Sequence, residues 1–195
     1  MKTYDMPQRS PEWIQIRLGK LTASRFPKLF MGKTTAGYND VINTATYERL
    51  TGETPESFSN NWMERGTELE SKAIQAYEFS TFEKVHSIGF VELDENIGCS
   101  PDGLIGKEGM IQIKCPKYNT LINYHLSGHV PKDYNIQMQG EMYITGRKWN
   151  IFYAWHPLLK PFIVKIERDD ILINKIMIEI DLALKLINER IKKLR

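Results

Sequence analysis

The sequence predicts one domain of the α/β or α+β class, and three observations point to it. The 195 residues are enough for a single domain with a substantial core, but not for two. Segments with helical spacing of apolar residues surround a central pair in which apolar and polar residues alternate. No internal repeat, low-complexity tract or Pro/Gly-rich linker divides the chain. We therefore expect a single domain over residues 1–195.

The first elements are expected to be helices. Residues 39–51 form one, because Gly52 and then Pro55 supply a stop signal. Residues of about 60–79 form another, in which the apolar side chains fall near one face.

Strands are expected in the middle of the chain. Alternating and β-branched residues predict a strand over 85–93. A turn at 98–103 should lead into a short strand at 104–105. The next strand, 110–115, ends at Pro116, which cannot donate to a strand ladder.

The last third returns to helices around a strand pair. A helix is expected within 133–145, followed by strands at about 149–155 and 161–167. The final helix, 169–194, has the clearest pattern, because its Ile and Leu residues recur at helical spacing. This apolar stripe should pack on the core, and part of it could face a neighbouring subunit.

Composition limits the compartment and the partners. The formal net charge is only +2, so any contact with nucleic acid must come from local clusters of Lys and Arg. Cys99 and Cys115 are the only cysteines, too few for a disulfide framework or for the four thiolates of an iron–sulfur cluster. No apolar run reaches the ~18 residues of a membrane span, and residues 1–10 lack a signal-peptide core. We expect a cytoplasmic protein.

The predicted hairpin gathers side chains that suit phosphodiester hydrolysis. Gln112 and Lys114 share one face of the second strand, because residues two apart point the same way. The hairpin would bring Asp102 beside both. A carboxylate binds hard cations such as magnesium, and a lysine can orient water or steady charge on a phosphate. Taken alone, an Asp and a Lys around a turn are more often a bland surface hairpin.

Five segments in a fixed order are specific in combination. They are Trp13 with Arg17-Leu18-Gly19 and Thr22-Ala23-Ser24; Gly66-Thr67-Glu68-Leu69-Glu70; the hairpin Ser100–Pro116; Gln137-Met138-Gln139 with Met142; and Ile166-Glu167-Arg168-Asp169. Together they resemble the lambda exonuclease and YqaJ-like viral recombinase family over roughly residues 8–170.

This resemblance implies both a fold and an activity. The fold would be a PD-(D/E)xK restriction-endonuclease-like core, with a central mixed sheet flanked by helices. The activity would be a magnesium-dependent 5′→3′ exonuclease on double-stranded DNA ends, using two ions, for which Mn²⁺ can substitute. Relatives are homotrimeric rings that work beside a single-strand annealing protein in phage recombination. The chain would then be a phage or prophage protein in a bacterial cytoplasm.

The resemblance also assigns roles to residues of the hairpin. Asp102 would bridge or bind the metals, position 112 would be the second metal carboxylate, and the carbonyl of Ile113 would be a further ligand. Lys114 would act on the attacking water.

Four residues outside the hairpin also receive roles from the resemblance. Glu70 would hold a metal or its water, and Gln139 would help to position the nucleophile. Arg17 and Ser24 would bind a phosphate near the 5′ end.

Position 112 departs from the family pattern, because the chain has Gln112 where the family has glutamate. The amide is nearly the same size but carries no charge, whereas two close cations need anionic ligands. We expect weakened metal binding and strongly reduced hydrolysis. Gln112 is either native or a deliberate substitution that traps an uncleaved DNA complex. We favour the substitution because the other elements of the site are intact.

Two rival functions remain open. A non-cleaving DNA-binding or regulatory protein on a nuclease fold would carry Gln112 natively. An endonuclease of the same superfamily is a weaker alternative. A zinc site at His125 and His129 is disfavoured, because Gly128 makes a regular helix doubtful and no third ligand is evident.

Overall fold

The computed structural model describes residues 1–55 and 61–195, without the side chains of 61–68. The helices are α1 (Pro11–Arg17), α2 (Phe26–Leu29), α3 (Ala36–Thr51), α4 (Asn61–Thr81), α5 (Tyr118–Ser127), α6 (Lys132–Thr145) and α7 (Asp170–Leu194). The strands are β1 (Lys2–Tyr4), β2 (Leu21–Thr22), β3 (Val85–His86), β4 (Phe90–Glu92), β5 (Ile97–Cys99), β6 (Gly103–Ile105), β7 (Gly109–Lys114), β8 (Trp149–His156) and β9 (Leu159–Glu167).

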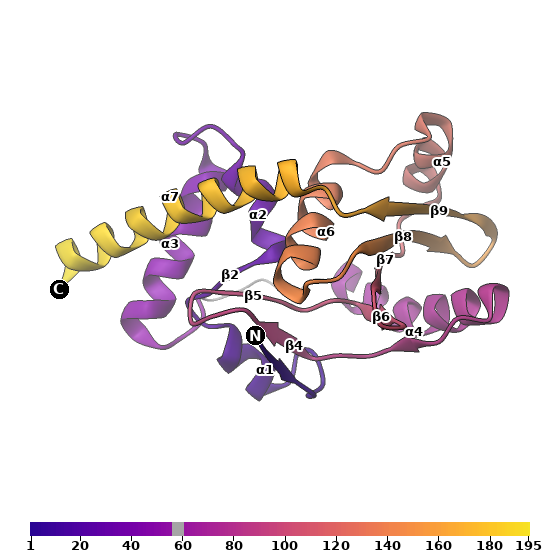
Figure 1. The fold of residues 1–195 in the computed structure, drawn as a ribbon, viewed down its shortest axis with the longest axis horizontal. Helices are drawn as coiled ribbons and strands as arrows, with labels where there is room; N and C mark the ends of the chain where they lie inside the picture. The colour runs from indigo at the N-terminus through magenta and orange to yellow at the C-terminus, as the bar shows by residue number, and fades with distance from the viewer. Residues whose placement is uncertain (56–60) are drawn as a thin grey trace.

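The larger sheet has the strand order β3-β6-β7-β8-β9. Strands β7 and β8 are parallel and the other neighbours are antiparallel, so the sheet is mixed. A smaller sheet has the order β1-β4-β5-β2. Figure 1 shows α4 and α5 beside the larger sheet, α6 at the centre, and α3 with α7 at the opposite end. The α+β architecture expected from the sequence, a mixed sheet with flanking helices, is confirmed.

Helices cover both faces of the larger sheet. Ala73 and Tyr77 of α4 pack with Ile111 and Ile113 of β7 on one face. Helices α5 and α6 cover the other face, where Met138 joins an apolar cluster with side chains of β8 and β9. Alternation along β7 therefore turns the intervening Gln112 towards α6.

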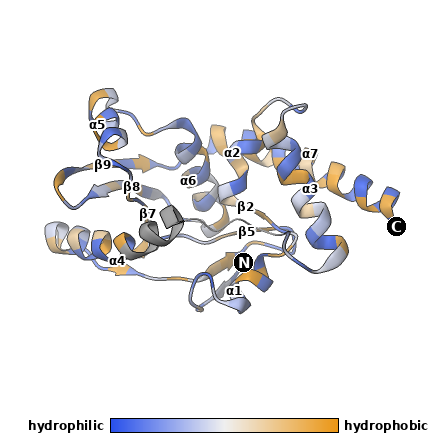
Figure 2. Cartoon of the chain, turned by 180° about the vertical axis from the view of Figure 1, so that it is seen from behind, coloured by the Kyte–Doolittle hydropathy of each residue, from blue (hydrophilic) through white to orange (hydrophobic). Residues whose placement is uncertain are grey.

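Helix α7 begins one residue after the predicted start at 169 and ends at the predicted 194, and most of its apolar stripe is buried or partly buried, although Met177 and Leu194 are exposed. Ile176, Ile180 and Ile187 belong to the same core cluster as Val41 and Ile42 of α3. Burial of each such side chain contributes about 1.5–3 kcal/mol. The alternation of apolar and polar residues along α7 is visible in Figure 2. None of the helices that the structure describes combines the length and apolarity that a bilayer crossing requires.

The single strand predicted over 85–93 was wrong, because the chain divides there between the two sheets. Strand β3 pairs with β6, whereas β4 pairs with β1 and β5. Gly89 lies between them, where an added Cβ would be 2.3 Å from the backbone oxygen of Met6. The turn predicted from Gly98 was also wrong at its start, since Gly98 lies inside β5.

The expectation of no regular helix near His125 was also wrong. Helix α5 includes His125 and ends at Gly128, which adopts φ 69° as a left-handed cap. The glycine therefore terminates the helix without disrupting it. The ring Nε2 of His125 lies 2.9 Å from the carbonyl oxygen of Lys160.

Candidate active site

The β6–β7 hairpin brings Asp102 and Gln112 together. Gly103 pairs with Ile111, so the preceding residue faces Gln112. The Asp102 Oδ2 atom accepts a hydrogen bond from the Gln112 side-chain amide and a second, at 2.7 Å, from the backbone amide of Ile113. The contact expected between Asp102 and Gln112 is therefore present.

Nearby positive charge partly offsets the effect of burial on the ionisation of Asp102. Burial is the largest influence on the pKa of Asp102 and raises it, whereas the positive charge of Lys114 lowers it. The Lys114 ammonium lies 5.1 Å from the centre of the Tyr134 ring on α6. Its charge also lowers the pKa of Glu70. Lys114 is thus an electrostatic partner of both carboxylates.

Glu70 approaches Asp102 from α4. Burial raises the pKa of Glu70, and the negative charge of Asp102 raises it further. The two side chains line a cavity of about 510 Å³, which we call the carboxylate cavity; Gln8 and Arg9 also line it. A site open to a ligand therefore exists between the N-terminal segment and the carboxylates.

A chain of polar groups, all buried except the half-buried Gln137, continues from Gln112 into α6. The Gln112 side chain is 1% exposed, and its Oε1 accepts a hydrogen bond of 2.8 Å from Gln137. Gln137 Nε2 also donates to Glu141 at 2.9 Å, and Asn150 donates to the other oxygen of Glu141 at 3.0 Å. Since Asp102 can only accept when ionised, Gln112 turns its nitrogen to Asp102 and its oxygen to Gln137.

Gln139 does not join this cluster. Its side-chain amide donates to the carbonyl of Glu167 at 2.8 Å, and its oxygen accepts from the backbone amide of Asp169 at 2.8 Å. It therefore joins α6 to the connection between β9 and α7. Gln137 contacts the cluster instead, because residues two apart on a helix point in nearly opposite directions.

Glu141 is a buried acid that the sequence did not single out. Burial raises its pKa to about 8, and the charge of Asp102 contributes. The Oδ1 atom of Asn150 is buried without a hydrogen-bond partner among the described residues. A protonated Glu141 can donate to this oxygen if the Asn150 amide is turned over. The spare acceptor and the raised pKa both favour the neutral acid.

Arg17 lines a cavity beside the N-terminal helix and contacts the loop that leads to Asp102. Its guanidinium stacks 4.0 Å from the centre of the Trp13 ring and donates to the hydroxyl of Ser100 at 2.8 Å. Burial, and then the charge of Arg25, lower the pKa of Arg17 to about 10, so it stays charged at neutral pH. Ser100 is two residues before Asp102, which connects this region to the carboxylates.

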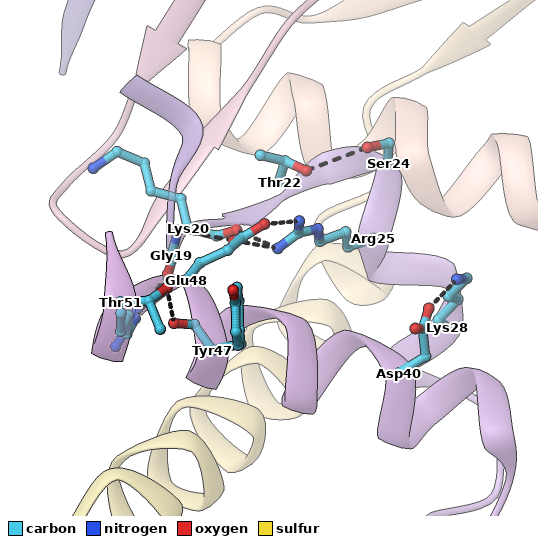
Figure 3. A network of polar contacts seen from close by, with 11 residues as sticks. Gly19, Lys20, Thr22, Ser24, Arg25, Lys28, Asp40, Tyr47, Glu48 and Thr51 are labelled. Atoms are coloured by element: carbon cyan, nitrogen blue, oxygen red, sulfur yellow. Dashed lines mark hydrogen bonds and ion pairs between the residues drawn. The ribbon is translucent and has the colours of Figure 1, made fainter. Parts of the chain in front are cut away.

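A second cavity of about 510 Å³, which we call the anchor cavity, is lined by Trp13, Arg17, Thr22 and Arg25 among others. Ser24 is exposed and is not among its lining residues. The Ser24 hydroxyl lies 3.2 Å from that of Thr22, and Figure 3 marks this contact with a dashed line.

Arg25 in the anchor cavity is already paired. Its guanidinium forms an ion pair of 2.9 Å with Glu48, and Figure 3 draws this pair. Arg17 is therefore better placed than Arg25 to bind an added anion in this cavity.

The donor set fits a divalent cation incompletely. Among the described residues, no group of three or more His, Cys, Asp and Glu side chains is placed to hold a metal ion. Asp102 and Glu70 supply carboxylates, and the carbonyl of Ile113 is a further oxygen. Position 112 presents nitrogen to Asp102 and supplies no charge. Two close cations need more anionic oxygens than these.

Comparisons with known proteins agree on one kind of relative. The YqaJ-like viral recombinase domain matches residues 12–148. The alkaline exonuclease LHK-Exo from Laribacter hongkongensis is 37% identical, with 95% of this chain and 96% of that chain covered and a TM-score of 0.87. Its complex with dAMP gives a TM-score of 0.88 at the same identity and coverage.

A more distant structure shares the fold. A phage-related exonuclease from Haemophilus somnus 129PT is 18% identical, with a TM-score of 0.71 and 90% of this chain and 96% of that chain covered. No curated protein matches the chain.

Proposed function

The chain belongs to the family of YqaJ-like viral recombinase domains, and we propose that it is a deoxyribonuclease that degrades double-stranded DNA from its 5′ ends. One observation carries the proposal: Asp102 contacts Gln112 and Ile113 and is coupled to the charges of Lys114 and Glu70. The 37% identical LHK-Exo is an alkaline exonuclease, and its complex with dAMP supports a nucleotide site. We further propose that residues 1–195 act as one domain.

The side chains of the site would have different roles in hydrolysis. Magnesium, held by Asp102, Glu70 and the carbonyl of Ile113, would supply positive charge at the scissile phosphate. Lys114 would orient the attacking water and steady the charge that develops on the phosphate. Gln137 would hold the side chain at position 112. Gln139, which was expected to help to position the nucleophile, would instead support the site indirectly by joining α6 to the connection before α7.

Gln112 would make the site a poor catalyst. Its amide nitrogen engages the Asp102 oxygen that a cation would otherwise approach. A glutamate at this position would repel Asp102 and so favour a cation between them. We propose that this chain binds metal weakly and cleaves slowly for that reason.

Arg17 would select the 5′ end. Its charge lies within the anchor cavity and its guanidinium donates to Ser100. A terminal phosphate offers more charge and more acceptor oxygens than a hydroxyl, so it would bind Arg17 more strongly. Ser24, an exposed residue, would contribute if its side chain turned towards the phosphate.

The experiment that tests this function uses duplex DNA labelled at either end, with magnesium and the Gln112→Glu variant. Early release of the 5′ label as a mononucleotide is expected. Early loss of the 3′ label would reverse the polarity, and internal fragments would favour an endonuclease. Absence of any cleavage would contradict the nuclease assignment.

A second candidate is a DNA-binding protein that does not cleave. The hydrogen bond between Gln112 and Asp102 favours it, because this bond stabilises the site without a cation. For this candidate, restoring the glutamate would leave the chain inactive, whereas DNA binding would persist without metal.

We also propose that the chain assembles as a homotrimer and acts with a single-strand annealing protein. With a net charge of only +2, a monomer attracts DNA weakly and would retain it poorly. A ring of three subunits can instead retain the DNA by enclosing it. Exposed apolar side chains on the surface, such as Ile178, Leu126 and Leu158, could be covered in such an assembly. Light scattering should give about three times 22.7 kDa, and a mass of one chain would contradict it.

A further inference from the structure

We propose that Arg9 binds a phosphodiester of the DNA strand that runs from the anchor cavity to the carboxylate cavity. This inference rests on the proposed function, because it assigns a contact to the same substrate. Arg9 was not among the residues that the sequence singled out.

The position of Arg9 between the two cavities is the first argument. The anchor cavity is lined by Arg9 together with Trp13 and Arg17. The carboxylate cavity is lined by Arg9 together with Glu70 and Asp102. A strand whose 5′ end lies beside Arg17 and whose cleaved bond lies beside Asp102 must therefore pass Arg9.

The backbone at Arg9 is the second argument. Its φ is 72°, a left-handed conformation that costs energy for residues with a Cβ. Backbone strain of this kind persists only where the surrounding structure imposes it, and it concentrates at functional sites. A glycine would adopt this conformation freely, so the local backbone gains nothing from an arginine here.

The neighbours of Arg9 hold that conformation in place. Gln8 donates hydrogen bonds to the carbonyls of Ile88, at 3.0 Å, and Pro101, at 2.9 Å. Ser10 caps helix α1 by accepting from the amide of Trp13 at 3.2 Å. Because Pro101 directly precedes Asp102, these bonds fix the Arg9 backbone against the segment that carries the catalytic carboxylate.

The charge of Arg9 is the third argument. The side chain is exposed, and no residue that the structure describes forms a hydrogen bond or an ion pair with its guanidinium. Arg9 lines the carboxylate cavity together with Glu70 and Asp102, so its positive charge lies near both carboxylates. A phosphodiester that approaches two carboxylates is repelled by them, and a cation beside them reduces this repulsion.

An arginine suits this task because its planar guanidinium can donate two hydrogen bonds to one phosphate. Lys114 approaches Asp102 from β7, within the hairpin. Arg9 approaches from the N-terminal segment, between the cavities. The bound strand would thus meet one cation at Arg17, one at Arg9 and one at Lys114.

The test measures DNA binding without metal, so that cleavage plays no part. A fluorescent duplex with a 5′-phosphate is titrated in chelator, at several salt concentrations, with the unchanged chain, Arg9→Gly and Arg9→Lys. Lys185→Ala serves as the control, because it removes one exposed positive charge from α7. Thermal melts are recorded for every variant.

Arg9→Gly should weaken binding about tenfold and make the plot of log affinity against log salt shallower by about one unit, as loss of one phosphate contact requires. Its melting temperature should be unchanged or higher, because glycine relieves the left-handed backbone. Arg9→Lys should keep the salt slope with an intermediate affinity. Lys185→Ala should bind like the unchanged chain.

Two results would overturn the role of Arg9: an unchanged affinity and salt slope in Arg9→Gly, or weaker binding that only accompanies a lower melting temperature. If the unchanged chain does not bind DNA, both this inference and the proposed function fail. If it binds through Arg9 but the Gln112→Glu variant never cleaves, only the proposed nuclease activity fails.

Discussion

The side-chain amide of Gln112 donates to Oδ2 of Asp102. The same oxygen accepts the backbone amide of Ile113 at 2.7 Å. Two neutral donors thus stabilise this carboxylate where the family pattern places a metal and a second acid. The relationship links the folding of the hairpin to the chemistry of the site, because a change of charge at position 112 alters both.

Lys114 can be tested once the carboxylate at position 112 is restored. In the Gln112→Glu background, Lys114→Ala should abolish turnover, because the charge that acts on Asp102 and Glu70 is lost. DNA affinity should fall by less than about tenfold, as expected for one phosphate contact. Single-turnover cleavage and metal-free binding separate the two effects. Loss of a cooperative thermal melt would instead assign Lys114 a role in folding.

Arg17 should determine the preference for a phosphorylated end. In the Gln112→Glu protein, cleavage of 5′-phosphorylated DNA should exceed that of 5′-hydroxyl DNA by about tenfold or more. Arg17→Ala should remove most of this ratio, whereas Arg17→Lys should retain part of it. Rates on both substrates measure the ratio directly. Equal rates on the two ends before any substitution at Arg17 would refute the role.

Glu141 should make stability depend on pH. Its pKa is raised from the ordinary 4.5 to about 8, so the folded chain holds this proton more tightly than the unfolded chain. The unfolding free energy should therefore fall as pH rises from about 4.5 to about 8, by at most about 1.4 kcal/mol per pH unit. Urea unfolding at pH 5, 7 and 9 measures this dependence.

Glu141→Gln should reduce this loss. The variant should exceed the unchanged chain in stability at pH 9, by an amount on the order of 1–3 kcal/mol, and by less at pH 5. The Asn150 amide can turn over to accept from the new glutamine. Glu189→Gln, an exposed change on α7, is the control. Parallel stability profiles for Glu141→Gln and the unchanged chain would show that Glu141 does not hold the proton.

The sequence was sufficient where local periodicity decides the structure. The alternation at 110–115 predicted that Gln112 and Lys114 share a face, and the turn before it predicted the contact with Asp102. The spacing in α7 predicted the buried stripe that includes Ile176 and Ile180. In both segments, the apolar side chains that form the sequence pattern are also the ones that the fold buries.

Other features depend on contacts that no local pattern encodes. Residues 85–93 divide between two sheets because β3 and β4 pair with different strands, and Met6, distant in sequence, approaches Gly89 between them. Gln137, and not Gln139, contacts Gln112 because of the way α6 is rotated against β7. The sequence could not distinguish the two residues, since both are glutamines. Glu141 looked like an ordinary helix residue, because only tertiary packing buries it.

The most direct measurement is the rate at which this chain and its Gln112→Glu variant degrade the same linear 5′-phosphorylated duplex at saturating magnesium. The account predicts that the variant is faster by at least about a hundredfold, because an anionic ligand returns to the site and the amide no longer engages Asp102. Equal rates for the two proteins would contradict the account of position 112 and of the metal site built on it.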